Sequence, residues 1–329
     1  MRSSDPERRA ALRRGLVRCV LLAVAAAVLF SALDLALYPC TFMRNDIHAL
    51  TTEPHDVLIL GTSNGKMDLD PESMLTGTGL TGHNLCVGGE YPVDAYYLAR
   101  LALETQRPQQ IIFELDPGYL MTEKEPGNNE TLFIHEFPLS RAKLEYFGAT
   151  LLQRDFRAAL FPFYEYSLTY TLPRAPETLQ RKLARDYGTA HLQGSAQAYH
   201  ADGFIEKYPV AEAAFPAYTP VAFDADALVS ENLEYLDRLI ELCRAEDVRL
   251  VFAVMPLPER TLRDDGANWD AAWDCFADWF AARDVEFFNF NREYYDWYSH
   301  DAANYVDYDG HMNGDSARAF SQIFGALVF

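Results

Sequence analysis

The chain contains a run of four apolar residues, Val57–Leu60, that ends abruptly in five small or polar ones, Gly61-Thr-Ser-Asn-Gly65. An uninterrupted apolar run of this length is typical of a strand that is buried on both faces of a parallel sheet. Ligands of open α/β sheets bind at the carboxyl ends of the strands. Ser63 therefore stands where a nucleophile could be presented, although serine is also common in ordinary turns.

The alternation of strand and helix patterns continues along the chain. Further short apolar runs predict four more strands, at 84–87, 110–115, 248–254 and 285–290. Helical patterns lie between and after them, starting at 70 and covering 93–105, 230–246, 269–282 and 314–324. Such alternation implies parallel strands with right-handed crossovers. We therefore predict an α/β fold: a flavodoxin-like, doubly wound, mostly parallel sheet of five strands.

Residues 117–226 interrupt this alternation. They hold helical stretches at 140–147, 151–160 and 176–187, scattered prolines and many aromatic residues, but no convincing strand. We interpret the segment as a helical insertion packed over the carboxyl edge of the sheet. Some of its aromatic side chains could stack on sugars, although a role in the core of the insertion is the simpler interpretation; they are Phe161, Phe163, Tyr164, Tyr166 and Tyr170.

The N-terminus carries a membrane signal. Cys19–Tyr38 is a mostly apolar segment of twenty residues, long enough as a helix to cross a hydrocarbon core of roughly 30 Å. Six arginines precede it, which places the N-terminus in the cytoplasm and exports the rest. The expected organisation is a cytoplasmic tail (1–15), a single-pass signal-anchor helix (16–38), a tether (39–54) and an extracytoplasmic domain (55–329). A cleaved signal peptide is the alternative, but no convincing cleavage site follows the apolar segment.

Charge and spacing exclude several functional classes. The net charge is −20, and the part of the chain after the basic N-terminus is more acidic still, which argues against nucleic-acid binding. Five cysteines are too few for a disulfide framework, and no Cys/His spacing resembles a zinc site, so we expect no metal or cofactor. A phosphate-binding loop is excluded because only three residues separate Gly61 from Gly65 and Met67 follows Lys66.

A second polar loop, Asp307-Tyr-Asp-Gly-His-Met-Asn313, precedes the last predicted helix. A serine hydroxyl is a weak nucleophile unless a base removes its proton and an acid orients the base. This loop supplies histidine and aspartate at close spacing. Taken alone, His311 could be a solvated loop residue and Asn313 a helix cap. Together with Ser63 in one fold, they favour a catalytic interpretation.

Three short motifs resemble those of the SGNH (GDSL-like) hydrolase superfamily. Gly61-Thr-Ser-Asn64 is similar to the nucleophile block, Asn84-Leu-Cys-Val-Gly-Gly89 to the second block, and Asp307–Asn313 to the last. The resemblance implies that Ser63 attacks an acyl carbonyl and His311 transfers its proton. It also implies an oxyanion hole formed by the backbone amides of Ser63 and Gly89. The anchor and the insertion are most similar to exported members tied to acyl modification of bacterial surface polymers, such as teichoic-acid D-alanylation and alginate O-acetylation proteins.

The sequence departs from that family in two places. The family's aspartate lies three residues before its histidine, but Tyr308 occupies this position, flanked by Asp307 and Asp309. We choose Asp309 as the residue that orients His311, with Asp307 as the alternative acid. The family's third block, Gly-x-Asn-Asp, is absent. The third strand ends instead at Asp116, which cannot donate to an oxyanion when ionised, so Asn64 is a candidate for the missing donor.

These features predict an anchored serine esterase or O-acyltransferase that acts on acyl (acetyl-like) esters of cell-surface glycan or polymer. It would need an acyl donor or ester substrate and could work with a membrane-bound acyltransferase. The alternative is a catalytically decayed module that binds glycan or partners such an acyltransferase. A weaker third hypothesis is a metal-dependent phosphodiesterase that uses Asp68, Asp70 and Asp116.

Overall fold

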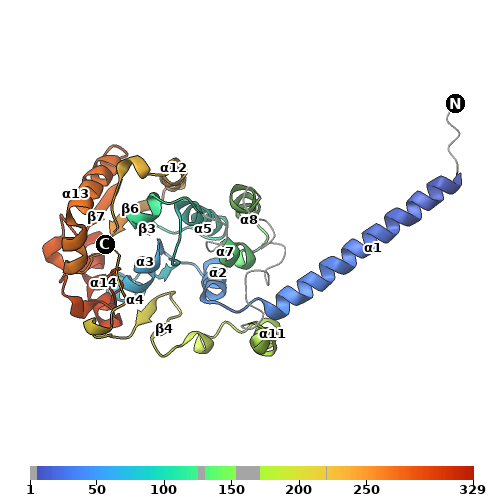
Figure 1. Ribbon diagram of the computed structural model, residues 1–329, viewed down its shortest axis with the longest axis horizontal. Helices are drawn as coiled ribbons and strands as arrows, with labels where there is room; N and C mark the ends of the chain where they lie inside the picture. Colours follow the sequence, from blue (N-terminus) through green and yellow to red (C-terminus); the bar gives the residue numbers. More distant parts are fainter. Residues whose placement is uncertain (1–5, 125–129, 153–170, 220) are drawn as a thin grey trace. The chain divides into compact units, whose positions relative to one another are not determined.

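The computed structural model describes residues 6–124, 130–152, 171–219 and 221–329 (Figure 1). The chain divides into two compact units, residues 1–40 with 155–186 and residues 41–154 with 187–329. Helix α11 (Ala175–Ala184) packs against α1 (Pro6–Leu37) in the smaller unit. The larger unit contains the sheet.

The sheet has five parallel strands in the order β2-β1-β3-β6-β7, which is the doubly wound, flavodoxin-like arrangement. The predicted fold class is therefore confirmed. The strand bounds are Val57–Leu60 (β1), Gly82–Asn84 (β2), Gln110–Glu114 (β3), Arg249–Val254 (β6) and Glu286–Asn289 (β7). Strand β2 ends earlier than expected, but Leu85 and Val87 still donate backbone hydrogen bonds to Ile59 and Gly61 along the edge of β1.

Alternate residues of the strands face two helical layers. On one face, Val57 and Ile59 belong to a buried cluster with Phe320 and Phe324 of α14 (Gly314–Val328). These two phenylalanines lie one turn apart and share the apolar stripe of an amphipathic helix. On the other face, the ring centres of Phe252 and Phe280 lie 4.5 Å apart, and Phe280 belongs to helix α13 (Glu259–Ala281). Burying each phenylalanine stabilises the fold by roughly 1.5–3 kcal/mol, so the sheet is held from both sides.

The remaining elements follow the predicted order with some shifts. Helix α13 begins ten residues earlier than predicted. The short helices after Gly61 and Asp116 were not predicted, because segments of six and four residues are too short to show an apolar stripe. The helices of the larger unit are α2 (Phe42–Thr52), α3 (Ser63–Asp68), α4 (Pro71–Met74), α5 (Pro92–Thr105), α6 (Pro117–Leu120), α7 (Glu130–Glu136), α8 (Arg141–Tyr146), α12 (Ser230–Ala245), α13 (Glu259–Ala281) and α14, with a π-helical turn at Phe147–Leu151. The 3₁₀ turns are Leu172–Arg174, Ala190–Leu192, Glu212–Ala214, Ala225–Ala227, Tyr295–Trp297 and Ala302–Asn304.

The insertion contains a β-hairpin, contrary to the prediction that it is entirely helical. Strands β4 (Gln197–Tyr199) and β5 (Ile205–Lys207) pair antiparallel. Their connection includes Gly203 at φ +89°, and a Cβ there would lie 2.1 Å from the Asn84 carbonyl oxygen. Only glycine lets the hairpin approach the end of β2 so closely. Three-residue strands carry too little periodicity to detect from sequence. The expected helix at 151–160 extends beyond the described residues, and the aromatic side chains at 161–170 lie outside them.

Residues 39–54, expected to be a tether, mostly form helix α2. Met43, Ile47 and Leu50 are buried along one side of it. On the same helix the fully buried Asp46 carboxylate accepts hydrogen bonds from Lys66 Nζ (2.8 Å) and Tyr199 Oη (2.6 Å). The tether prediction is therefore wrong for this segment. The apolar residues at spacings of four and three were the sequence signal for an amphipathic helix.

The N-terminal helix α1 includes one stretch, Arg9–Leu37, that is long and apolar enough to cross a membrane. Length and composition of this kind fit a signal anchor and also a signal peptide. The helix begins at Pro6, within the segment that was predicted as the cytoplasmic tail.

Candidate functional site

Ser63 occupies the carboxyl end of β1, directly beside β3. The chain leaves the strand through Gly61, at φ +137°, where a Cβ would lie only 2.6 Å from the carbonyl oxygen of Glu114. Thr62 caps the short helix α3, and Ser63 is its first residue. The boundary between β1 and β3 is the point at which the strand order reverses, where doubly wound folds bind their ligands.

The last polar loop brings a histidine and an aspartate to this serine. Ser63 Oγ lies 2.9 Å from His311 Nε2, across 248 positions of sequence. His311 Nδ1 lies 2.7 Å from Asp307 Oδ2. The other Asp307 oxygen, Oδ1, accepts the backbone N–H groups of Asp309 (3.1 Å) and His311 (3.2 Å). Hydroxyl, imidazole and carboxylate thus form one hydrogen-bonded chain, and this arrangement is that of a serine-hydrolase triad.

Asp307, rather than the preferred Asp309, contacts the imidazole. Gly310, at φ +102°, turns the loop so that the Asp307 side chain, four residues before His311, reaches Nδ1. Burial raises the pKa of Asp307, but the hydrogen bond and charge of His311 outweigh this effect and leave the pKa below its usual value. Asp309 has instead a raised pKa, because it is partly buried and lies near the Asp307 charge. The choice of Asp309 over Asp307 is corrected accordingly.

A buried carboxyl at the end of β3 supports the turn that leads from β1 into α3. Glu114, only 1% exposed, accepts the Thr62 N–H (2.6 Å) and the Thr62 hydroxyl (2.9 Å) through Oε2. Burial, reinforced by the charge of Asp116, raises the pKa of Glu114 to about 7. Glu114 was not predicted as a site residue, although an acidic side chain at the end of an apolar strand was the available signal.

Two further contacts join α3 to the loop 307–313, which we call the histidine loop. The fully buried Asp68 accepts the Met312 N–H through Oδ1 at 2.8 Å, and burial raises its pKa well above the usual value. Asn64 Nδ2 donates to the carbonyl oxygen of Asp309 at 3.1 Å. Both contacts connect α3, which carries Ser63, to the loop that carries His311. They therefore help to hold the two side chains at hydrogen-bonding distance.

Two of the predicted oxyanion donors, Ser63 and Asn64, belong to α3, and the third, Gly89, follows a glycine that lies close to Ser63. Ser63 opens α3, and the N–H groups in the first turn of a helix have no acceptor within that helix. Gly88 lies against Ser63, since a Cβ on Gly88 would be 3.6 Å from the Ser63 Cβ. The next residue, Gly89, adopts φ +77°. Asn64 faces the cavity beside Ser63, with its amide donating to Asp309 as described above. A role for these groups in catalysis remains a prediction.

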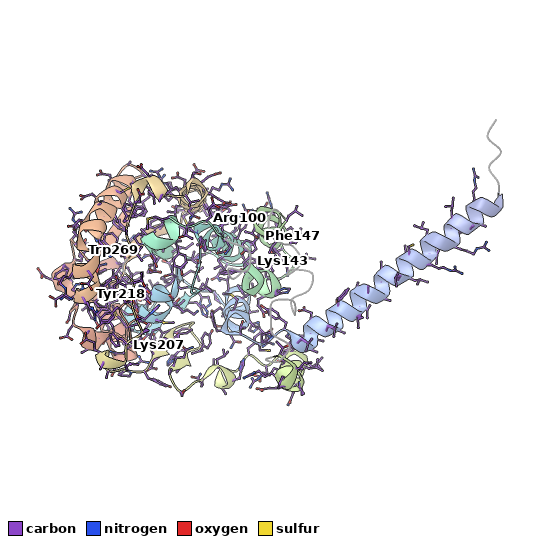
Figure 2. The ribbon with its side chains drawn as sticks, in the orientation of Figure 1. Arg100, Lys143, Phe147, Lys207, Tyr218 and Trp269 are labelled. Carbon is purple, nitrogen blue, oxygen red and sulfur yellow. The ribbon has the colours of Figure 1, made fainter. Side chains whose placement is uncertain are left out.

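A cavity of about 260 Å³ opens at Ser63 and His311. Its walls come from the ends of β3 and β6, from α13, from the histidine loop and from the insertion. Tyr218 and Trp269, labelled in Figure 2, both line it. Its other lining residues are Asn64, Glu114, Leu115, Asp116, Pro117, Tyr119, Val221, Val254, Met255, Leu257, Thr261, Tyr308 and Asp309. This volume, with mostly apolar walls, suits a small acyl group better than a long chain.

Asp116 lines the cavity at the carboxyl end of β3. Its Oδ1 accepts the Gly118 N–H at 2.8 Å, and burial raises its pKa. Asp68 accepts the Met312 N–H, and Asp70 caps α4 and accepts the Ser73 hydroxyl. In the part of the chain that the structure describes, no group of three or more His, Cys, Asp or Glu side chains could hold a metal ion.

Comparison with known proteins gives a remote structural similarity. No family model matches the chain, and no curated protein matches it. A solved structure described as "a putative platelet activating factor from Streptococcus pneumonia" aligns with a TM-score of 0.40 and 12% identity, covering 93% of this chain and 99% of that one. The fold class therefore rests on the strand order and pairing of this chain's own sheet.

Proposed function

We propose that this chain is a membrane-anchored serine esterase or O-acyltransferase that acts on small, acetyl-like acyl esters of a cell-surface glycan or polymer. The observation that carries the proposal is the continuous hydrogen-bond chain from Ser63 through His311 to Asp307, at 2.9 and 2.7 Å. Ser63 and His311 line a cavity whose volume suits a small acyl group. Membership of the SGNH superfamily is part of this proposal and is supported by the three motifs and by the sheet order.

In the proposed reaction, Ser63 Oγ forms a bond to the acyl carbon while its proton moves to His311 Nε2. The carbonyl π electrons move to oxygen and give a tetrahedral oxyanion. When the oxyanion collapses, the ester C–O bond breaks and the leaving alcohol takes the proton from His311. Water or a sugar hydroxyl then attacks the acyl-serine in the same way, with His311 again as the base.

Asp307 would hold His311 in the tautomer whose Nε2 is free to accept the serine proton, and it would stabilise the imidazolium that forms. The Ser63 and Gly89 amides, with Asn64 as a third candidate, would stabilise the oxyanion. One such donor is typically worth about 3 kcal/mol of transition-state stabilisation. Neither step requires a cofactor.

The anchor determines where the reaction would take place. The arginines before α1 favour a cytoplasmic N-terminus, so that the sheet-bearing unit would lie outside the cytoplasm. A surface polymer would then be accessible as substrate, and a membrane acyltransferase could supply the acyl donor.

Labelling with a fluorophosphonate probe tests the proposal. The wild-type chain in detergent should be modified stoichiometrically at Ser63, and Ser63→Ala should abolish both the labelling and the hydrolysis of p-nitrophenyl acetate. Wild-type protein that binds its polymer but neither labels nor hydrolyses the ester would support the decayed module instead. The absent third block is the observation that keeps this alternative open.

A further inference from the structure

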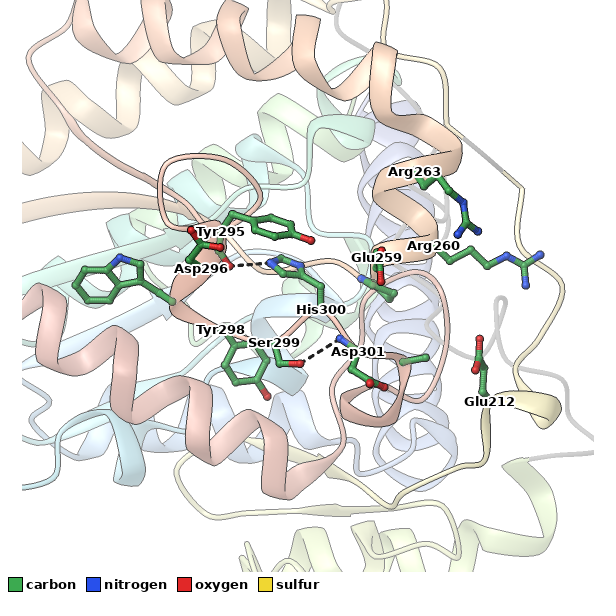
Figure 3. Close-up of a pocket in the computed structure, with 13 residues that line it drawn as sticks. Glu212, Glu259, Arg260, Arg263, Tyr295, Asp296, Tyr298, Ser299, His300 and Asp301 are labelled. Atoms are coloured by element: carbon green, nitrogen blue, oxygen red, sulfur yellow. Dashed lines mark hydrogen bonds between the residues drawn. The ribbon is translucent and has the colours of Figure 1, made fainter.

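A second, larger hollow lies beside the catalytic cavity. It has a volume of about 730 Å³ and is formed by the first turns of α13, by residues 295–302 and by Glu212 (Figure 3). Figure 3 shows Arg260 and Arg263 projecting from α13, with Glu212 on the facing segment. We call this hollow the lateral groove. Its lining residues are Glu212, Pro258, Glu259, Arg260, Arg263, Tyr295, Asp296, Trp297, Tyr298, Ser299, His300, Asp301 and Ala302.

Tyr308 lies between the lateral groove and the catalytic cavity. Tyr308 lines the catalytic cavity and follows the triad residue Asp307. Its hydroxyl donates to Glu212 Oε1 at 2.7 Å and accepts from Arg260 at 3.0 Å, and both of these residues line the groove. Thr261, next to Arg260, donates to the Tyr308 carbonyl at 2.6 Å. A ligand in the groove would therefore lie one side chain away from the nucleophile's cavity.

The lateral groove presents aromatic rings that are rigidly backed but open to solvent. Trp297 is 49% exposed and packs edge-on against Tyr294. Tyr295 is 39% exposed and stacks on His300, with the ring centres 4.0 Å apart. The His300 ring is itself fixed, because its nitrogens contact the carbonyl oxygens of Leu257 (2.6 Å) and Tyr295 (3.1 Å). Large rings exposed in this way are typical of binding surfaces.

Charges of both signs surround these rings. Four carboxylates and two guanidinium groups line the lateral groove, so it offers many hydrogen-bond acceptors and donors but a slight excess of negative charge. A polyanion would be repelled by this excess and by the net charge of −20. A neutral, hydroxyl-rich polymer matches the groove better, because its hydroxyls can pair with both kinds of charged group while its C–H faces cover the rings.

We propose that the lateral groove binds a neutral carbohydrate chain and presents its O-acyl substituent, past Tyr308, to Ser63. This inference rests on the proposed esterase or acyltransferase function and adds to it the substrate class and the place where the polymer lies. The groove contributes affinity for the polymer, whereas the bond-making steps stay in the catalytic cavity.

Kinetics with substrates of increasing length test the groove. The full chain in detergent is assayed with p-nitrophenyl acetate and with acetylated xylo-oligosaccharides of one to six sugars. In the wild type, KM should fall as the oligosaccharide lengthens. Trp297→Ala should raise KM for the hexamer about five- to tenfold with little change in kcat, the effect expected from losing one aromatic contact. Hydrolysis of p-nitrophenyl acetate by this variant should be unchanged, which also shows that it is folded.

Tyr208→Ala provides the matched control, because Tyr208 is 40% exposed and does not line the lateral groove. It should behave as wild type with every substrate. Direct binding of unmodified xylohexaose and of oligogalacturonate to Ser63→Ala separates neutral from anionic ligands. The proposal predicts binding of the neutral chain that Trp297→Ala weakens, and weaker or absent binding of the anionic chain.

The two proposals fail in different ways. Wild-type protein that does not react with fluorophosphonate or p-nitrophenyl acetate refutes the enzyme, and the binding experiment still tests the groove. Active wild-type protein whose KM is independent of oligosaccharide length, and which does not bind xylohexaose, refutes the groove alone. Preferential binding of oligogalacturonate would also overturn the assignment to a neutral chain.

Discussion

Exchanging Asp307 for asparagine changes the atom that faces the histidine ring with minimal change in shape. In the wild type, the carboxylate oxygen Oδ2 accepts the Nδ1–H at 2.7 Å, and Oδ1 receives two backbone N–H groups. Asparagine can keep the backbone contacts only by turning its NH₂ group toward Nδ1. The ring would then carry its proton on Nε2 and could no longer accept the proton of Ser63.

We expect a large kinetic effect from this single exchange. The corresponding substitution in serine proteases lowers kcat roughly 10⁴-fold, equivalent to about 5 kcal/mol in the activation barrier. A loss of about 10³- to 10⁴-fold in kcat for p-nitrophenyl acetate is therefore expected for Asp307→Asn. KM should change little, since Asp307 does not line the cavity.

The chain provides its own matched control two residues away. Asp309 is a partly buried carboxyl in the same loop, but Asp307 holds the ring nitrogen. Asp309→Asn should retain kcat to within about threefold, which corresponds to less than 1 kcal/mol. Both variants are compared with the wild type by steady-state hydrolysis and by the rate of fluorophosphonate labelling. If Asp309→Asn is the inactive variant and Asp307→Asn keeps its activity, the assignment of the acid is refuted.

Three further substitutions test the packing of the sheet-bearing unit, and each is followed by unfolding of the full chain in detergent. The pKa of Glu114 is about 7 in the folded state against a usual value of 4.5. Between these pH values the folded state binds more protons than the unfolded state, so the free energy of unfolding falls as the pH rises through this range. Glu114→Gln should remove up to about 3 kcal/mol of this pH dependence, and an unchanged slope between pH 5 and 8 would contradict the assignment. Lys66→Met leaves the buried Asp46 carboxylate without its ammonium partner and should lower the free energy of unfolding by about 3–5 kcal/mol. The control Arg238→Met removes an exposed pair with Glu234 and should lower it by less than about 0.5 kcal/mol. Similar losses in the two variants would argue against the buried pair. Gly325→Ala places a Cβ 2.0 Å from the Met74 carbonyl oxygen and should destabilise the fold by about 1–3 kcal/mol. The control Gly148→Ala has open space around its Cβ and should be neutral or slightly stabilising. Equal stabilities of the two variants would refute the clash at Gly325.

The sheet could be predicted because its strands are buried on both faces. Such strands are largely apolar, and runs such as Val57–Leu60 and Ile111–Phe113 stand out against the polar residues that follow them. Helices with one apolar stripe, such as α5 and α14, were predicted for the same reason. Helix α3 was missed because Ser-Asn-Gly-Lys carries no such stripe, and it forms only because tertiary contacts hold it.

The site was predictable in its residue types but not in its loop geometry. Ser63 and His311 follow from the need to place a hydroxyl and a base at the same sheet edge. The choice between Asp307 and Asp309 depends on how the chain turns at Gly310, and spacing alone does not encode this turn. Glu114 and Asp68 were missed as supports because their roles depend on which backbone N–H groups fold over them.

The attachment of the histidine loop to α3 has a consequence for how such a protein can change. Asp68 and Asn64 connect α3 directly to the loop that carries His311, whereas Tyr218, Val254 and Trp269 line the cavity from separate parts of the chain. Substitutions at those three positions would change the shape of the cavity without displacing Ser63 or His311. If the proposed function holds, the ester preference can therefore change by single substitutions that leave the Ser63–His311–Asp307 contacts in place.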